Sequence, residues 1–169
     1  MTLPGDVADS LTPYFGSDIL TSTRLFISEA LPIPDLPFSS ALRQCGIYIP
    51  SPSAIAAITF DNVIAARGHL PARVLFHELV HVVQYRLLGI DQFAQQYVEG
   101  FLAAGNYHQI PLECCAFDLE ECFALEQRTF SVERAVALWS EQLQSREATA
   151  HASRNPLVSN AVRLRGYRR

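Results

Sequence analysis

The sequence predicts an α+β domain in which a small N-terminal β-sheet precedes one long buried helix and further C-terminal helices. β-Branched and aromatic residues gather in two early segments, residues 21–28 and 54–66, which favours strands there. Between residues 74 and 83 every side chain is large and apolar except two histidines and a glutamate. A helix that is apolar on nearly all sides is a buried helix. After residue 90 the apolar residues recur at helical spacing.

The chain begins with one expected helix and one expected strand. Residues 6–14 are expected to be helical, because apolar side chains recur on one side and Gly16 follows. Residues 21–28 are expected to form a strand, since they combine threonine, phenylalanine and isoleucine.

The middle of the N-terminal part is expected to alternate loops and strands. Three prolines in residues 31–37 remove backbone donors, so this segment is expected to be a surface loop. Residues 45–50 are expected to form a short strand. Residues 54–66 divide into two β-rich halves at the turn-prone pair Asp61 and Asn62. A strand here, just before the buried helix, would be placed to offer its edge to an extended peptide.

The second half of the sequence predicts helices with recognisable ends. Pro71 suits the first turn of the buried helix and Gly89 suits its end. Asp91 can then cap the next helix. The three helices expected after Gly89 are residues 92–104, 111–127 and 131–146.

Composition favours one cytoplasmic domain, residues 1–150, and a flexible basic tail, residues 151–169. The 49% hydrophobic content of this 169-residue chain is sufficient for a core. A net charge of -4 gives no whole-chain case for nucleic acid, although the arginine-rich tail leaves a weak contact open. The first 16 residues lack the pattern of a secretory signal, and no apolar run is long enough for a membrane span. Export that reads no N-terminal signal remains an alternative.

The four cysteines do not predict a disulfide framework. Cys114 and Cys115 are adjacent and cannot easily bridge each other within a helix. Cys115 and Cys122 share a helix face and are expected to be small buried hydrophobes. No Cys-x-x-Cys pair occurs, which argues against a structural zinc-thiolate site.

The segment His77-Glu78-Leu79-Val80-His81 predicts a metal site. Residues four apart lie above one another on a helix, so His77 and His81 can bind a single ion. Glu78 can point at a water on that ion without being a ligand, as in the H-E-x-x-H pattern of zinc metallopeptidases. The alternatives are two core histidines that are hydrogen-bonded to neighbours and a degenerate site without metal.

A catalytic zinc needs a third protein ligand, which must lie downstream. Glu113 is favoured because it lies beside an apolar stripe in the first turn of its helix, although a glutamate there also suits the helix dipole. It begins an E-x-x-A pattern similar to the ligand helix of several glutamate-type zincins. Glu99 belongs to a polar helix face and is expected to be solvated. The remaining candidates are His108, Glu120 and Glu121.

Several segments together resemble a small zincin-like domain of bacterial proteins, often found beside toxin or injection-system effector modules. The similarity covers residues 11–127. It rests on residues 11–16, Arg24, residues 57–60, residues 77–85, Tyr107 and residues 110–113. The resemblance implies a minimal zincin-like fold with His77, His81 and Glu113 as zinc ligands and Glu78 as the catalytic carboxylate. Cys115 departs from the pattern, because relatives often have a second acid there.

The resulting hypothesis is a gluzincin-like zinc peptidase that hydrolyses a peptide or protein substrate with metal-activated water and Glu78 as general base. The tetrahedral oxyanion needs a further donor, for which Tyr107 and His108 are candidates and Tyr85 and Tyr97 the alternatives. A second hypothesis is a zincin-shaped binding or packaging module that retains zinc for its structure without proteolysis. The third is a metal-free scaffold.

Overall fold

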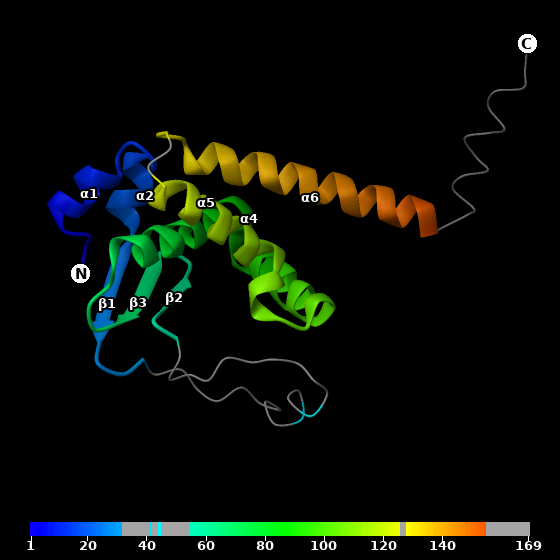
Figure 1. Ribbon diagram of the computed structural model, residues 1–169, viewed down its shortest axis with the longest axis horizontal. Helices are drawn as coiled ribbons and strands as arrows, with labels where there is room; N and C mark the ends of the chain where they lie inside the picture. Colours follow the sequence, from blue (N-terminus) through cyan, green and yellow to red (C-terminus); the bar gives the residue numbers. More distant parts are fainter. Residues whose placement is uncertain (32–40, 42–43, 45–54, 126–127, 155–169) are drawn as a thin grey trace, which may run out of the picture. The chain divides into compact units, whose positions relative to one another are not determined.

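The computed structural model describes residues 1–31, 41, 44, 55–125 and 128–154. It confirms the predicted α+β class, with a small three-stranded sheet and a set of α-helices (Figure 1). Contacts divide the chain into two compact units, Met1–Val136 and Ala137–Arg169. The first unit contains the sheet and the candidate site, and the second continues the last helix.

The sheet consists of β1 (Arg24–Ser28), β2 (Ala57–Phe60) and β3 (Val63–Arg67). Their order is β1-β3-β2, so β3 is central; it pairs in parallel with β1 and antiparallel with β2 (Figure 1). Asp61 has a φ of 52°, which is the left-handed conformation that a tight hairpin turn requires. The predicted division of residues 54–66 at Asp61 and Asn62 is therefore confirmed. β2 lies at an edge of this sheet.

Two short helices, α1 (Gly5–Leu11) and α2 (Ser17–Ser22), precede the sheet. The predicted helix over residues 6–14 ends earlier, and the strand predicted over residues 21–28 begins only at Arg24. The reason for the second difference is burial: α2 contacts the long helix α4, and its residues Ile19 and Leu20 are 2% and 3% exposed. Tertiary packing thus overrides the β-propensity of the residues at its end.

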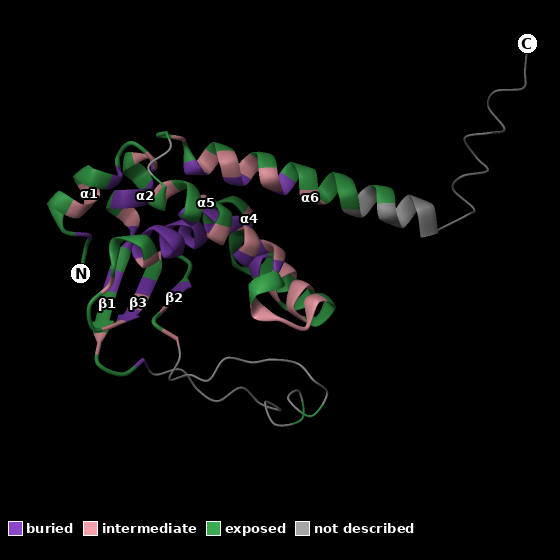
Figure 2. Cartoon of the chain, viewed as in Figure 1, coloured by how far each residue is buried: buried purple, intermediate pink, exposed green. Residues whose placement is uncertain are grey.

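Helix α4 (Ala72–Ala104) is the centre of the first unit. Its first half is buried over residues 75–85, where it packs against α5 and β2, and Figure 2 shows this stretch as the purple part of α4 beside the sheet. Gly89 interrupts the helix with a φ of 76° and a ψ of 165°, which confirms the predicted break. Helical structure resumes at once, so Asp91 lies inside the helix instead of capping it.

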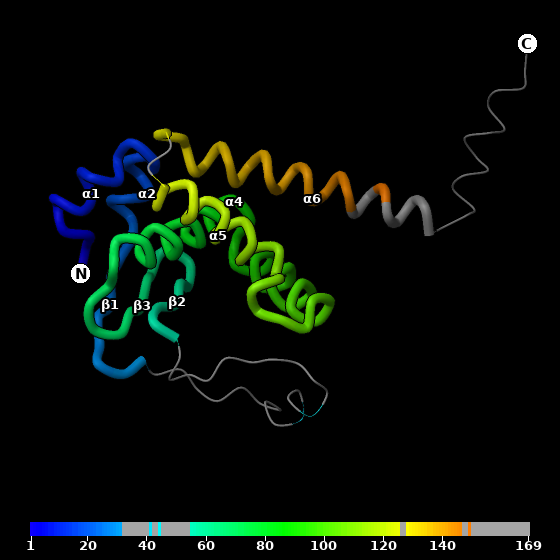
Figure 3. Tube along the Cα trace, in the orientation of Figure 1, coloured from blue at the N-terminus to red at the C-terminus, as the bar shows by residue number. Residues whose placement is uncertain are grey.

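A short 3-10 turn, η2 (Tyr107–Gln109), connects α4 to α5 (Pro111–Ala124). The trace in Figure 3 doubles back through this turn, so that α5 returns along α4. Gly100 permits a close approach here: a Cβ at this position would lie 2.7 Å from the Cδ of Pro111. The beginning of α5, with Glu113 in its first turn, is therefore held against α4.

The last helix, α6 (Val132–Arg154), begins in the first unit, where Val132 and Val136 are buried. Glu133 accepts a hydrogen bond from the backbone N–H of Gly16 at 2.6 Å, which attaches the start of α6 to the N-terminal segment. The second unit contains the continuation of α6 to Arg154, beyond the predicted end at residue 146. The loop predicted over residues 31–37 lies outside the described residues except for residue 31, and the strand predicted over residues 45–50 and Cys45 lie wholly outside them. The flexible tail was predicted over residues 151–169, but residues 151–154 belong to α6; the rest of the tail is not described.

Two further expectations concern single features of the described chain. Cys115 is buried as predicted, but Cys122 is exposed, because the face of α5 that carries it turns to solvent near the helix end. Among the residues that the structure describes, no helix is both long and apolar enough to cross a membrane.

Candidate metal centre

Three side chains from two helices converge in the interior of the first unit. His77 and His81 come from the buried half of α4, and Glu113 comes from the first turn of α5. The two Nε2 atoms are 3.1 Å apart, and Oε2 of Glu113 lies 3.2 Å from Nε2 of His77 and 3.4 Å from Nε2 of His81. The residues are 6%, 5% and 2% exposed. They form a buried group that could hold a metal ion.

The other residues considered as third ligand lie elsewhere. Glu99, His108 and Glu121 are exposed, so the expectation that Glu99 is solvated is confirmed. Glu120 is buried, but its carboxylate faces Nδ1 of His77, on the opposite edge of the ring from Glu113. Of these candidates, only Glu113 has an oxygen next to both Nε2 atoms.

Both imidazoles are oriented by acceptors on their Nδ1 side. Nδ1 of His77 lies 2.9 Å from Oε2 of Glu120, and Nδ1 of His81 lies 2.8 Å from Oε1 of Gln84. Gln84 is itself fixed, because its Nε2 donates to the carbonyl of Leu112 at 2.9 Å. Carboxylate and amide oxygens only accept hydrogen bonds, so each Nδ1 is the donor. A metal would take both rings in their neutral form, with the Nε2 lone pairs directed at the position shared with Glu113. Without a metal, a proton on Nε2 of His81 can be donated to the Glu113 carboxylate instead.

The Glu113 carboxylate is held ionised by its neighbours. Burial alone would raise its pKa, but hydrogen bonds with His77 and His81 outweigh burial and lower the pKa of Glu113 well below its ordinary value. The Tyr97 hydroxyl also donates to Oε1 of Glu113 at 2.8 Å. Burial and the charge of Glu113 raise the pKa values of Tyr97 and Tyr107, so both hydroxyls remain protonated donors at neutral pH.

Glu78 lies beside this group on the same helix and is 6% exposed. Its Oε2 accepts a hydrogen bond of 2.6 Å from the hydroxyl of Thr59, which belongs to the edge strand β2. A hydrogen bond to a carboxylate is stronger than one between neutral groups. The sheet edge therefore fixes the orientation of the Glu78 side chain.

An aromatic row connects the sheet edge to Glu113. Phe60 of β2 lies 5.9 Å from Tyr85 between ring centroids, Tyr85 stacks on Phe93 at 3.7 Å, and Phe93 lies 5.8 Å from Tyr97. Burial, together with the charge of Asp61, raises the pKa of Tyr85 to about 12. Tyr97, one of the alternatives for an oxyanion donor, is thus engaged with Glu113 at the end of this row.

Sequence reasoning missed three residues that hold the site together: Thr59, Arg73 and Gln84. Arg73 pairs through Nε with Oε1 of Glu120. Gln84 had a usable signal, because it is a polar residue three positions after His81 inside an apolar run. Thr59 and Arg73 had none, since their partners are fixed only by the packing of β2 and α5 on α4.

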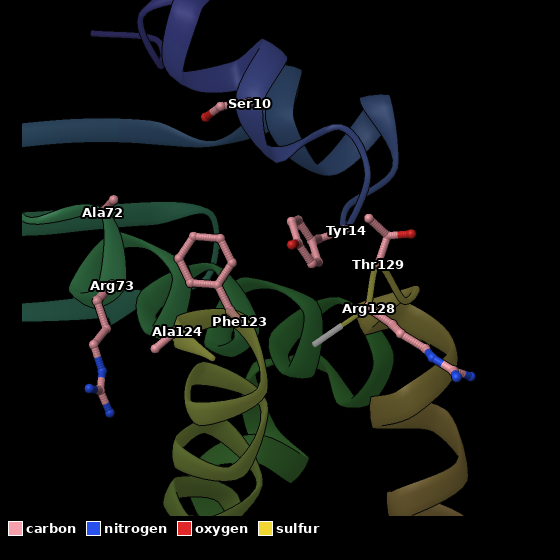
Figure 4. A pocket seen from close by; sticks show the side chains of 8 residues that line it. All are labelled: Ser10, Tyr14, Ala72, Arg73, Phe123, Ala124, Arg128 and Thr129. Atoms are coloured by element: carbon pink, nitrogen blue, oxygen red, sulfur yellow. The ribbon is translucent and has the colours of Figure 1, made fainter. Parts of the chain in front are cut away.

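A separate pocket of about 700 Å³ lies beside the start of α4 (Figure 4). The rings of Tyr14 and Phe123 face its interior, while the guanidinium groups of Arg73 and Arg128 extend away from those rings. None of its lining residues belongs to the group of His77, His81 and Glu113. The pocket is therefore distinct from the candidate metal centre.

The candidate site is thus a buried pair of imidazoles with one carboxylate, and a second carboxylate, Glu78, stands beside it. Within the described part of the chain, no fourth His, Cys, Asp or Glu joins the group. Comparisons of this chain with protein-family models, with curated proteins and with solved structures found no significant match.

Proposed function

We propose that the protein is a zinc-dependent peptidase of the glutamate-ligand type, with His77, His81 and Glu113 as ligands. The observation that carries this proposal is the spacing of the three donor atoms, 3.1, 3.2 and 3.4 Å. Tetrahedral ligands on zinc bonds of about 2.0–2.1 Å stand about 3.3–3.4 Å apart. Calcium and magnesium prefer all-oxygen ligand sets, so two imidazoles favour zinc over them.

The number of donors favours a catalytic zinc. Structural zinc sites are closed by four protein ligands, whereas catalytic sites have three and leave one position for water. Three donors meet in the described part of this chain. The fourth position would then be available to water and, during turnover, to a substrate carbonyl.

Glu78 is the proposed general base and acid. When bound, zinc supplies a Lewis acid that lowers the pKa of a coordinated water toward neutrality. Glu78 accepts a proton from the attacking water while the water oxygen forms a bond to the peptide carbonyl carbon. It then delivers that proton to the amide nitrogen, and the carbon–nitrogen bond breaks. The hydrogen bond from Thr59 holds the carboxylate in place for both transfers.

An extended peptide is the proposed substrate, because an edge strand lies next to the proposed base. Thr59 of β2 contacts Glu78, and β2 pairs with β3 on one side only within the described sheet. Addition of a peptide strand to such an edge supplies backbone hydrogen bonds and places a peptide carbonyl close to the site. Tyr107 is the proposed donor to the oxyanion, because its hydroxyl remains protonated, whereas the Tyr97 hydroxyl already donates to Glu113.

A second candidate function is a binding module that retains zinc for its structure. The burial of the site favours it, because His77, Glu78, His81 and Glu113 are all at most 6% exposed. A peptide substrate must reach the zinc and Glu78, and the low exposure of these four residues in the described part of the chain opposes such access.

Substitution Glu78→Gln separates the two candidates. For a peptidase, cleavage of a labelled peptide library should fall by about 10²–10⁴-fold, because the base is lost, while stoichiometric zinc remains bound. Glu99→Gln is the matched control, since Glu99 is an exposed glutamate on the same helix. Equal cleavage by Glu78→Gln and the control would show that Glu78 is not the base. Zinc binding by all forms without cleavage by any would favour the binding module.

A further inference from the structure

A chain of three side chains leads from the protein surface to the candidate metal centre. Nε of Arg73 pairs with Oε1 of Glu120, and Oε2 of the same carboxylate lies 2.9 Å from Nδ1 of His77. The Arg73 side chain is 58% exposed, whereas those of Glu120 and His77 are 11% and 7% exposed. Both carboxylate oxygens of Glu120 are thus committed, one to each partner.

We propose that Glu120, anchored by Arg73, is the positioning residue for His77 and raises the affinity of the site for zinc without touching the ion. This inference rests on the proposed zinc site. Because Glu120 accepts the Nδ1 proton, His77 has its Nε2 lone pair directed at the position shared with His81 and Glu113. A carboxylate partner also makes an imidazole a more basic ligand.

The two histidines differ in how they are supported. His81 donates to the neutral amide oxygen of Gln84, which the Leu112 carbonyl anchors. His77 donates to a carboxylate, and charge-assisted hydrogen bonds are about twice as strong as neutral ones. Arg73 orients Glu120: its ion pair fixes the plane of the Glu120 carboxylate, which would otherwise rotate about its side-chain bonds.

The direction of the Arg73 side chain agrees with this role. Figure 4 shows its guanidinium turned away from the rings of Tyr14 and Phe123, which face the neighbouring pocket. Its partner is Glu120 on α5, although Arg73 itself lies in the first turn of α4. The pair therefore joins the two helices that contribute the proposed zinc ligands.

The test measures zinc affinity of the full chain by competition with a chromophoric chelator. Glu120→Gln should weaken zinc binding about 10-fold, because an amide oxygen can still accept the proton but carries no charge, and Glu120→Ala about 100-fold. Glu121→Gln and Glu121→Ala are matched controls, since Glu121 is the exposed neighbour on α5, and should leave affinity unchanged. Arg73→Gln should weaken binding up to about 10-fold.

Arg86→Gln is the control for Arg73→Gln. Arg86 is also on α4, is 54% exposed and pairs with Asp18 at 2.9 Å, so it is an exposed, ion-paired arginine of the same helix whose partner is not Glu120. Both substitutions are at the surface and should leave the thermal midpoint similar, which keeps the comparison valid even where Glu120→Ala fails to fold.

A second readout needs no zinc. Nitrogen-15 NMR of the metal-free protein should show His77 with its proton on Nδ1, and Glu120→Gln should weaken that preference while Glu121→Gln should not. Wild-type affinity in Glu120→Gln and Arg73→Gln, with zinc still bound stoichiometrically, would overturn the positioning role and leave the proposed function intact. A wild-type protein that binds no zinc would overturn both.

Discussion

His81 and Glu113 share a buried contact in which each changes the protonation of the other. Burial lowers the pKa of His81, but its hydrogen bond with Glu113 and the charges of Glu113 and Glu78 outweigh burial and raise the pKa above 6.5. In the metal-free protein this raised pKa stabilises the fold fully below about pH 6.5, and the contribution is lost as the pH rises through the folded value. The lowered pKa of Glu113 stabilises the fold above its ordinary value of 4.5.

The pH dependence of zinc binding follows from the raised pKa of His81 and the lowered pKa of Glu113. The metal-free pair is most stabilising between about pH 4.5 and 6.5, where both groups are charged, and zinc must displace the proton of His81. We expect zinc to raise the thermal midpoint little at about pH 5.5 and strongly at about pH 8. Scanning fluorimetry with and without zinc at both values checks this. An equal shift at both pH values would contradict it.

Thr59 provides a second prediction for a single side chain. Thr59→Val preserves the shape of the side chain but removes the hydroxyl that donates to Glu78 at 2.6 Å. Loss of a hydrogen bond to a charged group, about 1.5–3 kcal/mol, should lower peptide cleavage about 10- to 100-fold with zinc content unchanged. Thr21→Val, at an exposed position of α2, is the control. Unchanged cleavage in Thr59→Val would remove Thr59 from the site.

Among the secondary-structure elements, α4 depends most on a single backbone conformation. Gly89 has a φ of 76° and a ψ of 165°, a region that is essentially restricted to glycine. Gly89→Ala should lower the free energy of unfolding by about 1–3 kcal/mol, despite the higher helix propensity of alanine. Gly5→Ala in α1, where a Cβ meets no atom within 4 Å, is the control. Urea denaturation measures the free energy of unfolding of both variants. Equal stability would contradict the claim that alanine is strained at position 89.

The sequence was sufficient for elements whose signals are local. The apolar run around His77 predicted the buried helix, Asp61 and Asn62 predicted the hairpin turn, and Gly89 predicted the break in α4. Helix α2 could not be predicted, because the burial of Ile19 and Leu20 and the contact of α2 with α4 arise only in the folded chain.

The same division holds for the site. His77, Glu78 and His81 belong to one helix, and their spacing alone predicted their proximity. Glu113 was favoured among five candidates, because the sequence indicated its place in the first turn of a helix. The other four candidates stayed open, because the sequence did not indicate where that helix packs. The roles of Thr59, Arg73 and Glu120 depend on contacts between elements, for which a single sequence has no signal.

For the molecule as a whole, the division of the chain into two units makes a prediction about where the site resides. All residues of the candidate centre lie in Met1–Val136, together with buried Val132 and Val136. A chain that ends at residue 136 should therefore still fold and bind zinc with the affinity of the full chain. Calorimetric titration compares the two forms. Loss of zinc binding in the shortened chain would show that the second unit completes the site.

The central claim is that His77, His81 and Glu113 enclose a zinc ion. X-ray absorption at the zinc edge of the protein, prepared without chelator, tests it most directly. The expected result is one zinc per chain with two imidazole nitrogens and carboxylate oxygen at about 2.0–2.1 Å. A folded protein without stoichiometric zinc, or a zinc shell that contains sulfur from Cys114 or Cys115 at about 2.3 Å, would contradict the claim.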